Sequence, residues 1–210
     1  MEHPETLPTV PAPALAEQVD VAQVMDAGIR PLWDGMPGVT GPVHAVRCAP
    51  GDNLAMHAAV YRAAPGSVIV VDSGGTPEAV AGGNVCAVAQ RRGIAGFVVD
   101  GHIRDLAEAR ALGFPVFARG VFPKPGVKRR VAEEADVVVG GVRVHTGDVV
   151  VADEEGIVVA PAAEARALLE AAVERDRADA AQSLDDWEAA HRAKVTAALE
   201  ALGDDAGLPA

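Results

Sequence analysis

The sequence predicts an α/β fold with a C-terminal helical extension. Between residues 53 and 119, three helical segments alternate with three short apolar strands, a pattern typical of parallel strands joined by crossover helices. After residue 162 the strand pattern stops and the chain is predicted to be helical. A length of 210 residues suits one domain with an appendage.

Charge and composition disfavour several classes of protein. The net charge is −12, from 18 Lys and Arg against 30 Asp and Glu, which argues against nucleic acid and anionic membranes as partners. The longest apolar runs are far shorter than a membrane span, and the first residues lack the basic and apolar stretches of a signal peptide. Two cysteines are too few for a disulfide framework or a zinc ribbon. We therefore expect a cytoplasmic protein.

The first third of the chain contains an arm, two helices and two strands. Residues 1–15 are rich in Pro and Ala and are predicted to form a flexible arm, followed by a helix over 16–29. Residues 43–48 alternate as a strand does, and a helix capped by Asn53 is expected to end near Ala63. Residues 67–72 form a continuous apolar run, as in a strand that is buried on both faces.

The middle third continues this alternation. Gly82-Gly83-Asn84 opens a helix, and Gly93 and Gly113 stand where glycine usually ends one. The expected elements are helix 85–92, strand 96–100, turn 101–104, helix 105–113 and strand 114–119.

The last third changes character twice. Four short apolar strands separated by turn residues are expected at 136–139, 142–145, 148–151 and 157–160, and they predict an antiparallel segment. A helix follows over 162–181, and Ser183 with Asp186 forms a capping box for another that ends at Leu202. The predicted parts are thus an α/β domain over 16–165, helices over 166–203 and a tail over 204–210.

The densest polar cluster, Asp100 to Asp105, follows a buried strand and precedes a helix, which is where α/β folds place ligands. Asp105 has two interpretations. With Glu108 it can form a capping box, or it can bind a divalent cation, because Mg²⁺ sites need only one or two protein carboxylates. Arg104 is either a surface cation or the group that binds a carboxylate or keto oxygen of a ligand.

Gly82, Gly83, Asn84 and Val85 form a second candidate, because bare backbone amides at a helix start bind anions. Gly-Gly before a helix is also a common turn. The chain lacks a G-x-G-x-x-G dinucleotide fingerprint, which weakens any methyl-transfer function that needs a nucleotide-type cofactor.

The histidines and the basic run give weaker signals. No two histidines have zinc-site spacing. His102 lies in the polar turn and could face a site, whereas His57 is interpreted as a helix residue with a satisfied ring. The basic run Lys124 to Arg130 is interpreted as a solvated or subunit-contacting loop.

Several segments together resemble the RraA-like family, which includes class II 4-hydroxy-4-methyl-2-oxoglutarate / 4-carboxy-4-hydroxy-2-oxoadipate aldolases. The resemblance covers roughly residues 20–165. The segments that carry it are Gly82–Val85, Gly93–Asp105, Gly51–Leu54, Pro115–Gly120 and Gly147–Asp153.

The resemblance implies a swivelling β/β/α domain that assembles as homotrimers or as hexamers of stacked trimers, with the site between subunits. It implies that Asp105 binds Mg²⁺ or Mn²⁺ and that Arg104 is the catalytic arginine, in contact with the pyruvyl part of a small 2-oxo acid. It also implies that the backbone from Gly82 to Val85 holds the substrate carboxylate. The expected function is a metal-dependent carbon–carbon lyase that works through a pyruvate enolate, as an oxaloacetate decarboxylase, an aldolase or both.

One position departs from the family pattern. The aldolases usually carry an acidic residue 21 positions before the arginine, where this chain has Gly83. We therefore expect better oxaloacetate decarboxylation than aldol cleavage, unless another base such as His102 acts, and we expect Gly83→Asp to raise the aldolase rate. The alternative is a non-catalytic RraA-like interaction protein, although that branch lacks the metal aspartate that Asp105 matches.

Overall fold

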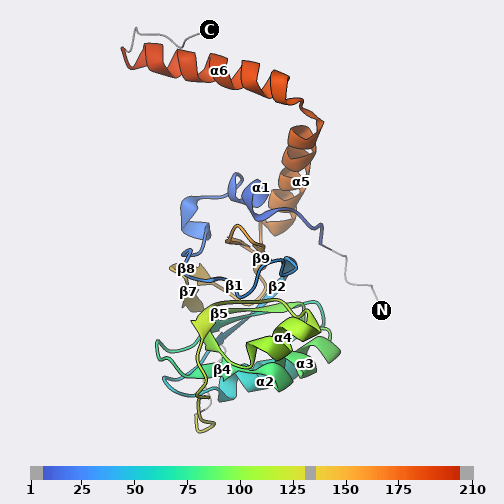
Figure 1. The fold of residues 1–210 in the computed structure, drawn as a ribbon, viewed down its shortest axis with the longest axis vertical. Coiled ribbons are helices and arrows are strands. Elements are labelled where there is room, and N and C mark those ends of the chain that lie inside the picture. The colour runs from blue at the N-terminus through green and yellow to red at the C-terminus, as the bar shows by residue number, and fades with distance from the viewer. Residues whose placement is uncertain (1–6, 131–135, 204–210) are drawn as a thin grey trace. The chain divides into compact units, whose positions relative to one another are not determined.

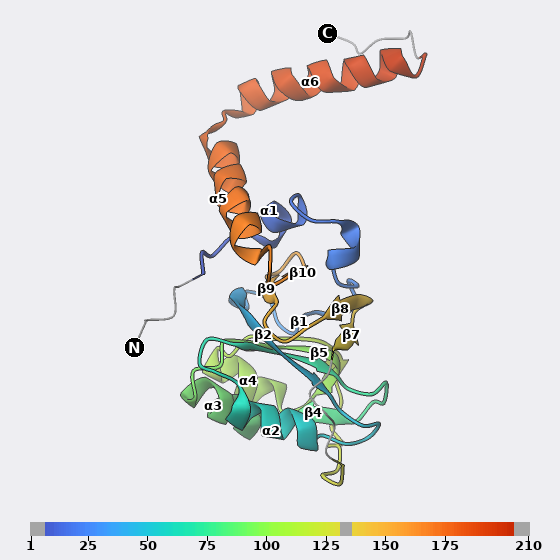
Figure 2. The ribbon, with the colours of Figure 1, turned by 180° about the vertical axis from the view of Figure 1, so that it is seen from behind.

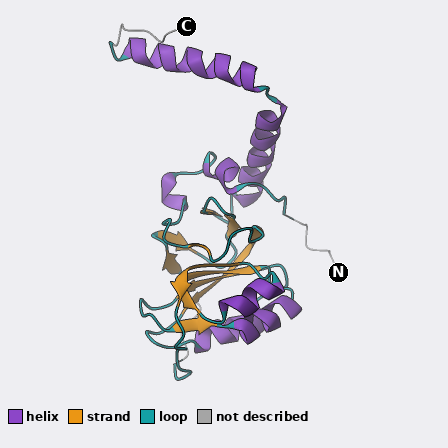
Figure 3. Ribbon diagram, in the orientation of Figure 1, coloured by secondary structure: helices purple, strands orange, loops and turns teal. Residues whose placement is uncertain are grey.

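The computed structural model describes residues 7–130 and 136–203. The chain divides into two compact units, Met1–Val173 and Glu174–Ala210. The first unit holds the sheet and most of the helices, and the described part of the second is helical (Figures 1 and 3).

The first unit is built on one large sheet with a parallel centre. The central strands β2, β3, β5 and β6 are parallel, while β1 and β9 pair antiparallel at either side. The strand order is β1 (Arg30–Pro31), β6 (Val116–Val121), β5 (Gly96–Ile103), β3 (Val68–Asp72), β2 (Val39–Arg47), β9 (Val149–Ala152) and β10 (Ile157–Ala160), with β4 (Ala79–Ala81) beside β5. The expected α/β class and parallel pairing are therefore confirmed.

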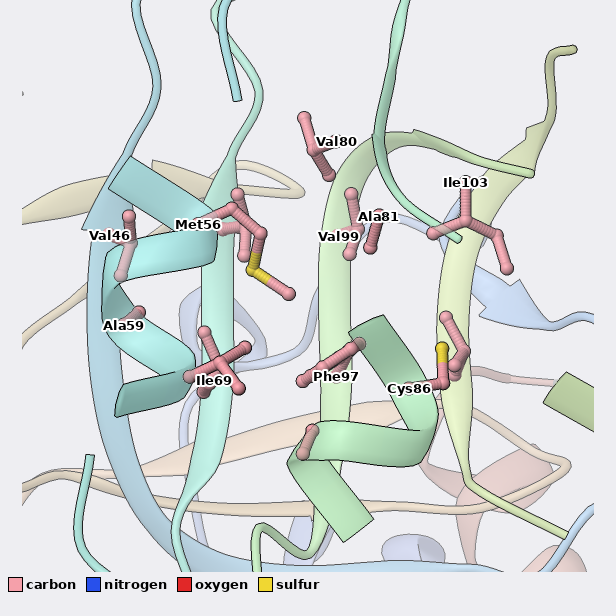
Figure 4. Packing of buried hydrophobic residues seen from close by; sticks show 14 of the residues in the cluster. Val46, Met56, Ala59, Ile69, Val80, Ala81, Cys86, Phe97, Val99 and Ile103 are labelled. Carbon is pink, nitrogen blue, oxygen red and sulfur yellow. The ribbon is translucent and has the colours of Figure 1, made fainter. Parts of the chain in front are cut away.

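Three crossover helices cover one face of this sheet: α2 (Leu54–Arg62), α3 (Gly83–Arg91) and α4 (Leu106–Leu112). The two views, taken from opposite directions, both show the three helices on the same side of the sheet (Figures 1 and 2). Figure 4 shows Met56 of α2 and Cys86 of α3 among strand residues such as Ile69 and Phe97, all of them fully buried. With few aromatics, this core consists mainly of Ala, Val and Ile, small side chains that let helices and sheet pack closely.

The opposite face is covered by chain segments rather than long helices. Met25 and Ile29 pack there against the hairpin of β7 (Val137–Val139) and β8 (Val142–Val144), and Phe117 of β6 lies in the same cluster. β9 and β10 pair antiparallel with each other and continue the large sheet through β2. The four strands expected after residue 136 are confirmed, but they belong to two sheets.

The N-terminal segment differs from both predictions made for it. Most of α1 (Ala12–Ala16) falls within residues 1–15, expected as the flexible arm, and Leu15 is fully buried in a cluster with strand residues of β9 and β10. The helix expected over 16–29 is wrong, since only the short 3₁₀ helix η1 (Val21–Gln23) forms there. Pairing explains this, because Met25 N–H donates to the Ile157 carbonyl at the edge of the sheet.

Two local predictions, one at the start of α2 and one at the end of β5, also need correction. Asn53 does not cap α2 with its side chain, because Asp52 Oδ1 accepts from Leu54 N–H instead, at 2.8 Å. A turn was expected at 101–104, but residues 101–103 belong to strand β5, which continues to Ile103 and pairs there with β4. That part of the prediction is wrong.

The C-terminal helices α5 (Ala165–Ala181) and α6 (Leu184–Ala201) form as expected. Ala165 and Leu169 in the first part of α5 are buried within the first unit. Ser183 caps α6, since its hydroxyl accepts from Asp186 N–H at 3.1 Å. The predicted tail over 204–210 lies outside the described residues. Among the described residues, no helix has both the length and the apolar character that crossing a membrane requires.

Candidate active site

A pocket of about 80 Å³ lies where strands β4 and β5 end. This is the edge of a parallel sheet at which α/β proteins bind ligands. Its lining comes from five segments of the chain: Asn53 and His57; Ala79 and Ala81; Gly82, Asn84 and Val85; Arg104 and Asp105; and Pro125 and Lys128.

The structure therefore brings the two sequence candidates together on one wall. β4 leads into Gly82 and the start of α3, and β5 leads into Arg104 and Asp105. The Arg104 N–H donates to the Ala81 carbonyl at 2.9 Å, and this bond holds the ends of β4 and β5 side by side. Gly83 is the one candidate outside the pocket lining, and its N–H lies 3.4 Å from Asp105 Oδ2.

Asp105 does not form the expected capping box. Its backbone is left-handed, with φ 57° and ψ 43°, and its side chain makes no capping hydrogen bond to α4. A normal N-cap has an extended backbone that aims the side chain at the next amides. Among the described residues, Asp105 is the only non-glycine with positive φ. Such strained residues cluster at functional sites, so the capping interpretation is wrong and the ligand-binding one gains support.

The carboxylate of Asp105 is directed at Arg104 and at the start of α3. Asp105 Oδ2 lies 3.4 Å from Arg104 Nε, and both side chains are about 40 % exposed, at 42 % and 37 %. A Cβ on Gly82 would stand 2.5 Å from the same carboxylate oxygen. Glycine is therefore required at position 82 for this approach of backbone to carboxylate.

The start of α3 offers fewer amides than expected. The N–H groups of Val85 and Cys86 both donate to the Gly82 carbonyl, at 2.9 and 3.0 Å. The Gly83 N–H donates to Asp105 Oδ2 at 3.4 Å, so the amide of Asn84 is the one left at this helix start to face an anion. Val85 lines the pocket, but its N–H is already used.

The space beside Gly83 is filled by Glu108 of α4. A Cβ on Gly83 would collide with the Glu108 carboxylate and would lie 2.6 Å from Glu108 Cβ. An acidic side chain at position 83 therefore fits only if Glu108 moves. The sequence could not show this, because the overlap depends on how α3 and α4 pack.

We accordingly expect Gly83→Asp to destabilise the fold by about 1–3 kcal/mol, the usual cost of overpacking. Urea unfolding would measure it. Asn84→Asp is the matched control, since it adds the same charge at the start of α3 without that overlap. Because the collision involves the Glu108 side chain, Glu108→Gly should recover most of the loss in the double variant. A stable Gly83→Asp protein with a raised aldolase rate would contradict this packing.

The wall of the pocket that α2 and the basic run contribute was missed by the sequence interpretation. Asn53 and His57, on the first turn of α2, and Lys128 all line the pocket. Burial, and then the nearby Lys128 cation, lower the pKa of His57 below its usual range, although a hydrogen bond to the Val80 carbonyl opposes them. His57 is thus neutral at neutral pH. The Asp52-Asn53 pair in Gly51–Leu54 was the available signal for this wall.

The basic run is not simply a solvated loop, because Asp52 holds it against the site. Asp52 is buried, and its Oδ2 accepts from the N–H groups of Arg129 and Arg130 at 2.6 and 3.0 Å. Burial would raise the pKa of Asp52, but these bonds and that of Leu54 N–H outweigh it and hold the pKa low. The anchored segment is what brings Lys128 to the pocket.

His102 lies elsewhere. It is not among the residues that line the pocket, and its ring packs against Phe122, with centroids 6.2 Å apart. The structure thus places His57, rather than His102, beside the candidate site.

The residues present fit a largely hydrated cation better than a fully protein-bound one. Among residues 7–130 and 136–203, no group of three or more His, Cys, Asp or Glu side chains is placed to hold a metal ion. Asp105 is the single carboxylate in the pocket lining, which is sufficient for Mg²⁺ because this ion keeps several of its waters.

Comparisons with known proteins show the family to which the chain belongs. A family model described as RraA-like, Aldolase/RraA, matches residues 12–159. A protein of Halalkalibacterium halodurans named "Putative 4-hydroxy-4-methyl-2-oxoglutarate aldolase" is 37 % identical over 176 residues, which cover 83 % of each chain.

Two solved structures share the fold. The RNA-processing inhibitor RraA from Thermus thermophilis is 29 % identical, with a TM-score of 0.61 over 66 % of this chain and 84 % of that one. An unusual member of the RNase ES inhibitor RraA protein family from Streptomyces coelicolor is 28 % identical, with a TM-score of 0.65 over 85 % and 88 % of the two chains.

Proposed function

The chain belongs to the RraA-like family, and from this premise we propose that it is a carbon–carbon lyase acting on small 2-oxo acids. The reaction passes through a pyruvate enolate, formed by retro-aldol cleavage of a 4-hydroxy-2-oxo acid, by decarboxylation of oxaloacetate, or by both. The observation that carries the proposal is the pair Arg104 and Asp105 at the pocket, with Asp105 held in a left-handed conformation in which its carboxylate does not cap α4 but points to the start of α3. The aldolase named above supports the class of reaction.

Asp105 is the residue that would hold Mg²⁺ or Mn²⁺. Bound there, the cation would act as a Lewis acid on the carboxylate and keto oxygens of the substrate. It would also offset the negative charge of Asp105 and Glu108, two carboxylates that lie against Gly82 and Gly83, where the substrate carboxylate must bind.

The chain's own groups supply binding and charge stabilisation. The amide of Asn84 binds the substrate carboxylate at the positive end of α3. Arg104 donates to the keto oxygen, which becomes the enolate oxygen as the carbon–carbon bond breaks. A donor already in place for this developing charge stabilises the transition state by roughly 3–4 kcal/mol. Lys128 is positioned to attract an anionic group at the far end of the substrate.

The proposal is tested by pyruvate release from oxaloacetate with Mg²⁺ and with a chelator. We expect pyruvate above the spontaneous rate with the ion and a return to that rate with the chelator. Equal rates in both conditions would contradict the metal assignment to Asp105.

The second candidate is a non-catalytic regulator, which the two RraA structures favour. Arg104 and Asp105 in one pocket argue for the enzyme. A protein that leaves both oxaloacetate and 4-hydroxy-4-methyl-2-oxoglutarate unchanged, yet inhibits a ribonuclease E-type enzyme, would be such a regulator.

We also propose that the chain assembles as a homotrimer or hexamer. Apolar side chains such as Val121, Val127 and Val138 remain 45–48 % exposed in the single chain, and an interface would cover such residues. Light scattering should give a mass of three or six times 21.5 kDa. A stable and active monomer would contradict this assembly.

A further inference from the structure

Asn53, which lines the pocket, carries an unsatisfied acceptor. The residue is 2 % exposed, and its Nδ2 donates to the Gly126 carbonyl at 3.2 Å. That bond fixes the orientation of the amide, so Oδ1 is the atom left over, and it is buried without a partner among the described residues. A buried acceptor in this state is costly. Since Asn53 lines the pocket, a ligand that carries a hydrogen-bond donor would satisfy it.

His57 stands one helical turn further on and lines the same pocket. The two residues are linked by the backbone bond from His57 N–H to the Asn53 carbonyl, at 3.1 Å. One ring nitrogen of His57 donates to the Val80 carbonyl. In a neutral imidazole the other nitrogen is an acceptor. The first turn of α2 therefore offers two acceptors to a ligand.

Burial is the main cause that lowers the pKa of His57, and a nearby cation adds to it. Lys128 approaches from the segment after β6 and lowers the pKa of His57, as burial does. Arg104 and Asp105, which follow β5, line the same pocket with opposite charges. Tyr61, one turn further along α2, lines a neighbouring hollow with His57. Neutral His57 is the form that can accept a proton.

We propose that this wall binds the hydroxyl group of a 4-hydroxy-2-oxo acid, with His57 as the base that takes the hydroxyl proton and Asn53 as the residue that positions it. The inference rests on the lyase function proposed above and names the group that makes its aldol branch work. A single hydroxyl hydrogen can be shared between two acceptors in a three-centre bond. Of these two, only the imidazole is basic enough to remove it.

The step balances without a further reagent. The hydroxyl proton moves to the free ring nitrogen of His57, and the C4 oxygen forms a carbonyl. The C3–C4 bond breaks, and its electron pair forms the enolate that Arg104 stabilises. The enolate then takes a proton at C3, which regenerates neutral His57 and gives pyruvate and a second carbonyl compound. Decarboxylation of oxaloacetate has no hydroxyl proton to remove, so it does not need His57.

This difference between the two substrates provides the main test. His57→Gln should lower kcat for 4-hydroxy-4-methyl-2-oxoglutarate by about 10²–10⁴-fold, the usual contribution of a positioned base. Oxaloacetate decarboxylation by the same variant should stay within about twofold of the wild type, which also shows that the variant is folded. His191→Gln on α6 is the matched control and should change neither rate, and His102→Gln tests the alternative base.

The pH profile separates a base from a merely structural residue. Wild-type kcat/KM for the hydroxy acid should rise with pH through a pKa below 6.5 and then level off, because the neutral form of His57 is active. This rise of kcat/KM with pH should be absent in His57→Gln.

Asn53 is tested as a positioning residue with two variants. Asn53→Leu removes the acceptor and should lower the ratio of the aldol cleavage rate to the decarboxylation rate. Asn53→Asp keeps an acceptor and should lower this ratio less. KM for oxaloacetate should change little in a folded variant.

The outcomes distinguish this inference from the function on which it rests. If the wild type cleaves the hydroxy acid and His57→Gln lowers both reactions equally or neither, His57 is not the base and the inference is wrong. If the ratio changes in His102→Gln instead, the base is His102. If the wild type releases pyruvate from neither substrate, both the function and the inference are wrong.

Discussion

Arg104→Ala should lower kcat for pyruvate formation by about 10²–10³-fold from either substrate, because it removes the donor that meets the developing enolate charge. KM should change less than kcat, since the interaction is strongest in the transition state. Arg104→Lys should recover only part of the rate, because an ammonium lacks the planar fork of donors. Steady-state assays on oxaloacetate and on 4-hydroxy-4-methyl-2-oxoglutarate measure both parameters.

Arg110→Ala is the matched control for that prediction. Arg110 is exposed on α4, six residues further along the chain, and is not among the residues that line the pocket. Its removal should leave kcat unchanged. If Arg104→Ala kept wild-type kcat, the enolate would be stabilised by another group.

Asp105 variants should separate activity from stability. Asp105→Gly and Asp105→Ala should both abolish metal-dependent activity, because each removes the carboxylate in the pocket lining. Their stabilities should differ, since alanine is strained at φ 57° and glycine is not. The glycine variant should therefore be more stable than the alanine variant by about 1–2 kcal/mol.

Urea unfolding at equal protein concentration, together with the pyruvate assay, checks this second prediction. A glycine variant less stable than the alanine variant would show that the left-handed backbone is not strained. Full activity in either variant would remove Asp105 from the site. If stability rises as activity is lost, the strain at Asp105 is a cost that the fold carries for function.

The sequence was sufficient for the parts of the fold that depend on local patterns. Continuous apolar strands such as Val68–Asp72, separated by helices that end at Gly93 or Gly113, predict a parallel sheet, and the sheet is there. The same logic places Arg104 and Asp105 after a strand, at the sheet edge that binds ligands. The N-terminal helix was wrong because pairing with Ile157, far away in the sequence, overrides local helix preference.

The rest of the site depends on contacts that no local pattern reveals. Lys128 reaches the pocket because Asp52, more than seventy residues earlier, accepts from the backbone at Arg129 and Arg130. Glu108 fills the space at Gly83 because of the way two helices pack. These are tertiary effects, so the sequence could name residues on one wall of the pocket and not those on the other.

The most direct test of the central claim is a crystal structure of the protein with pyruvate and Mg²⁺. The account predicts pyruvate in the pocket at the ends of β4 and β5, with its carboxylate on the amide of Asn84 and its keto oxygen on Arg104. It also predicts the ion at Asp105. Pyruvate bound elsewhere, or a pocket that stays free of pyruvate and metal at saturating concentrations of both, would contradict the assignment of this pocket as the site of a 2-oxo acid lyase.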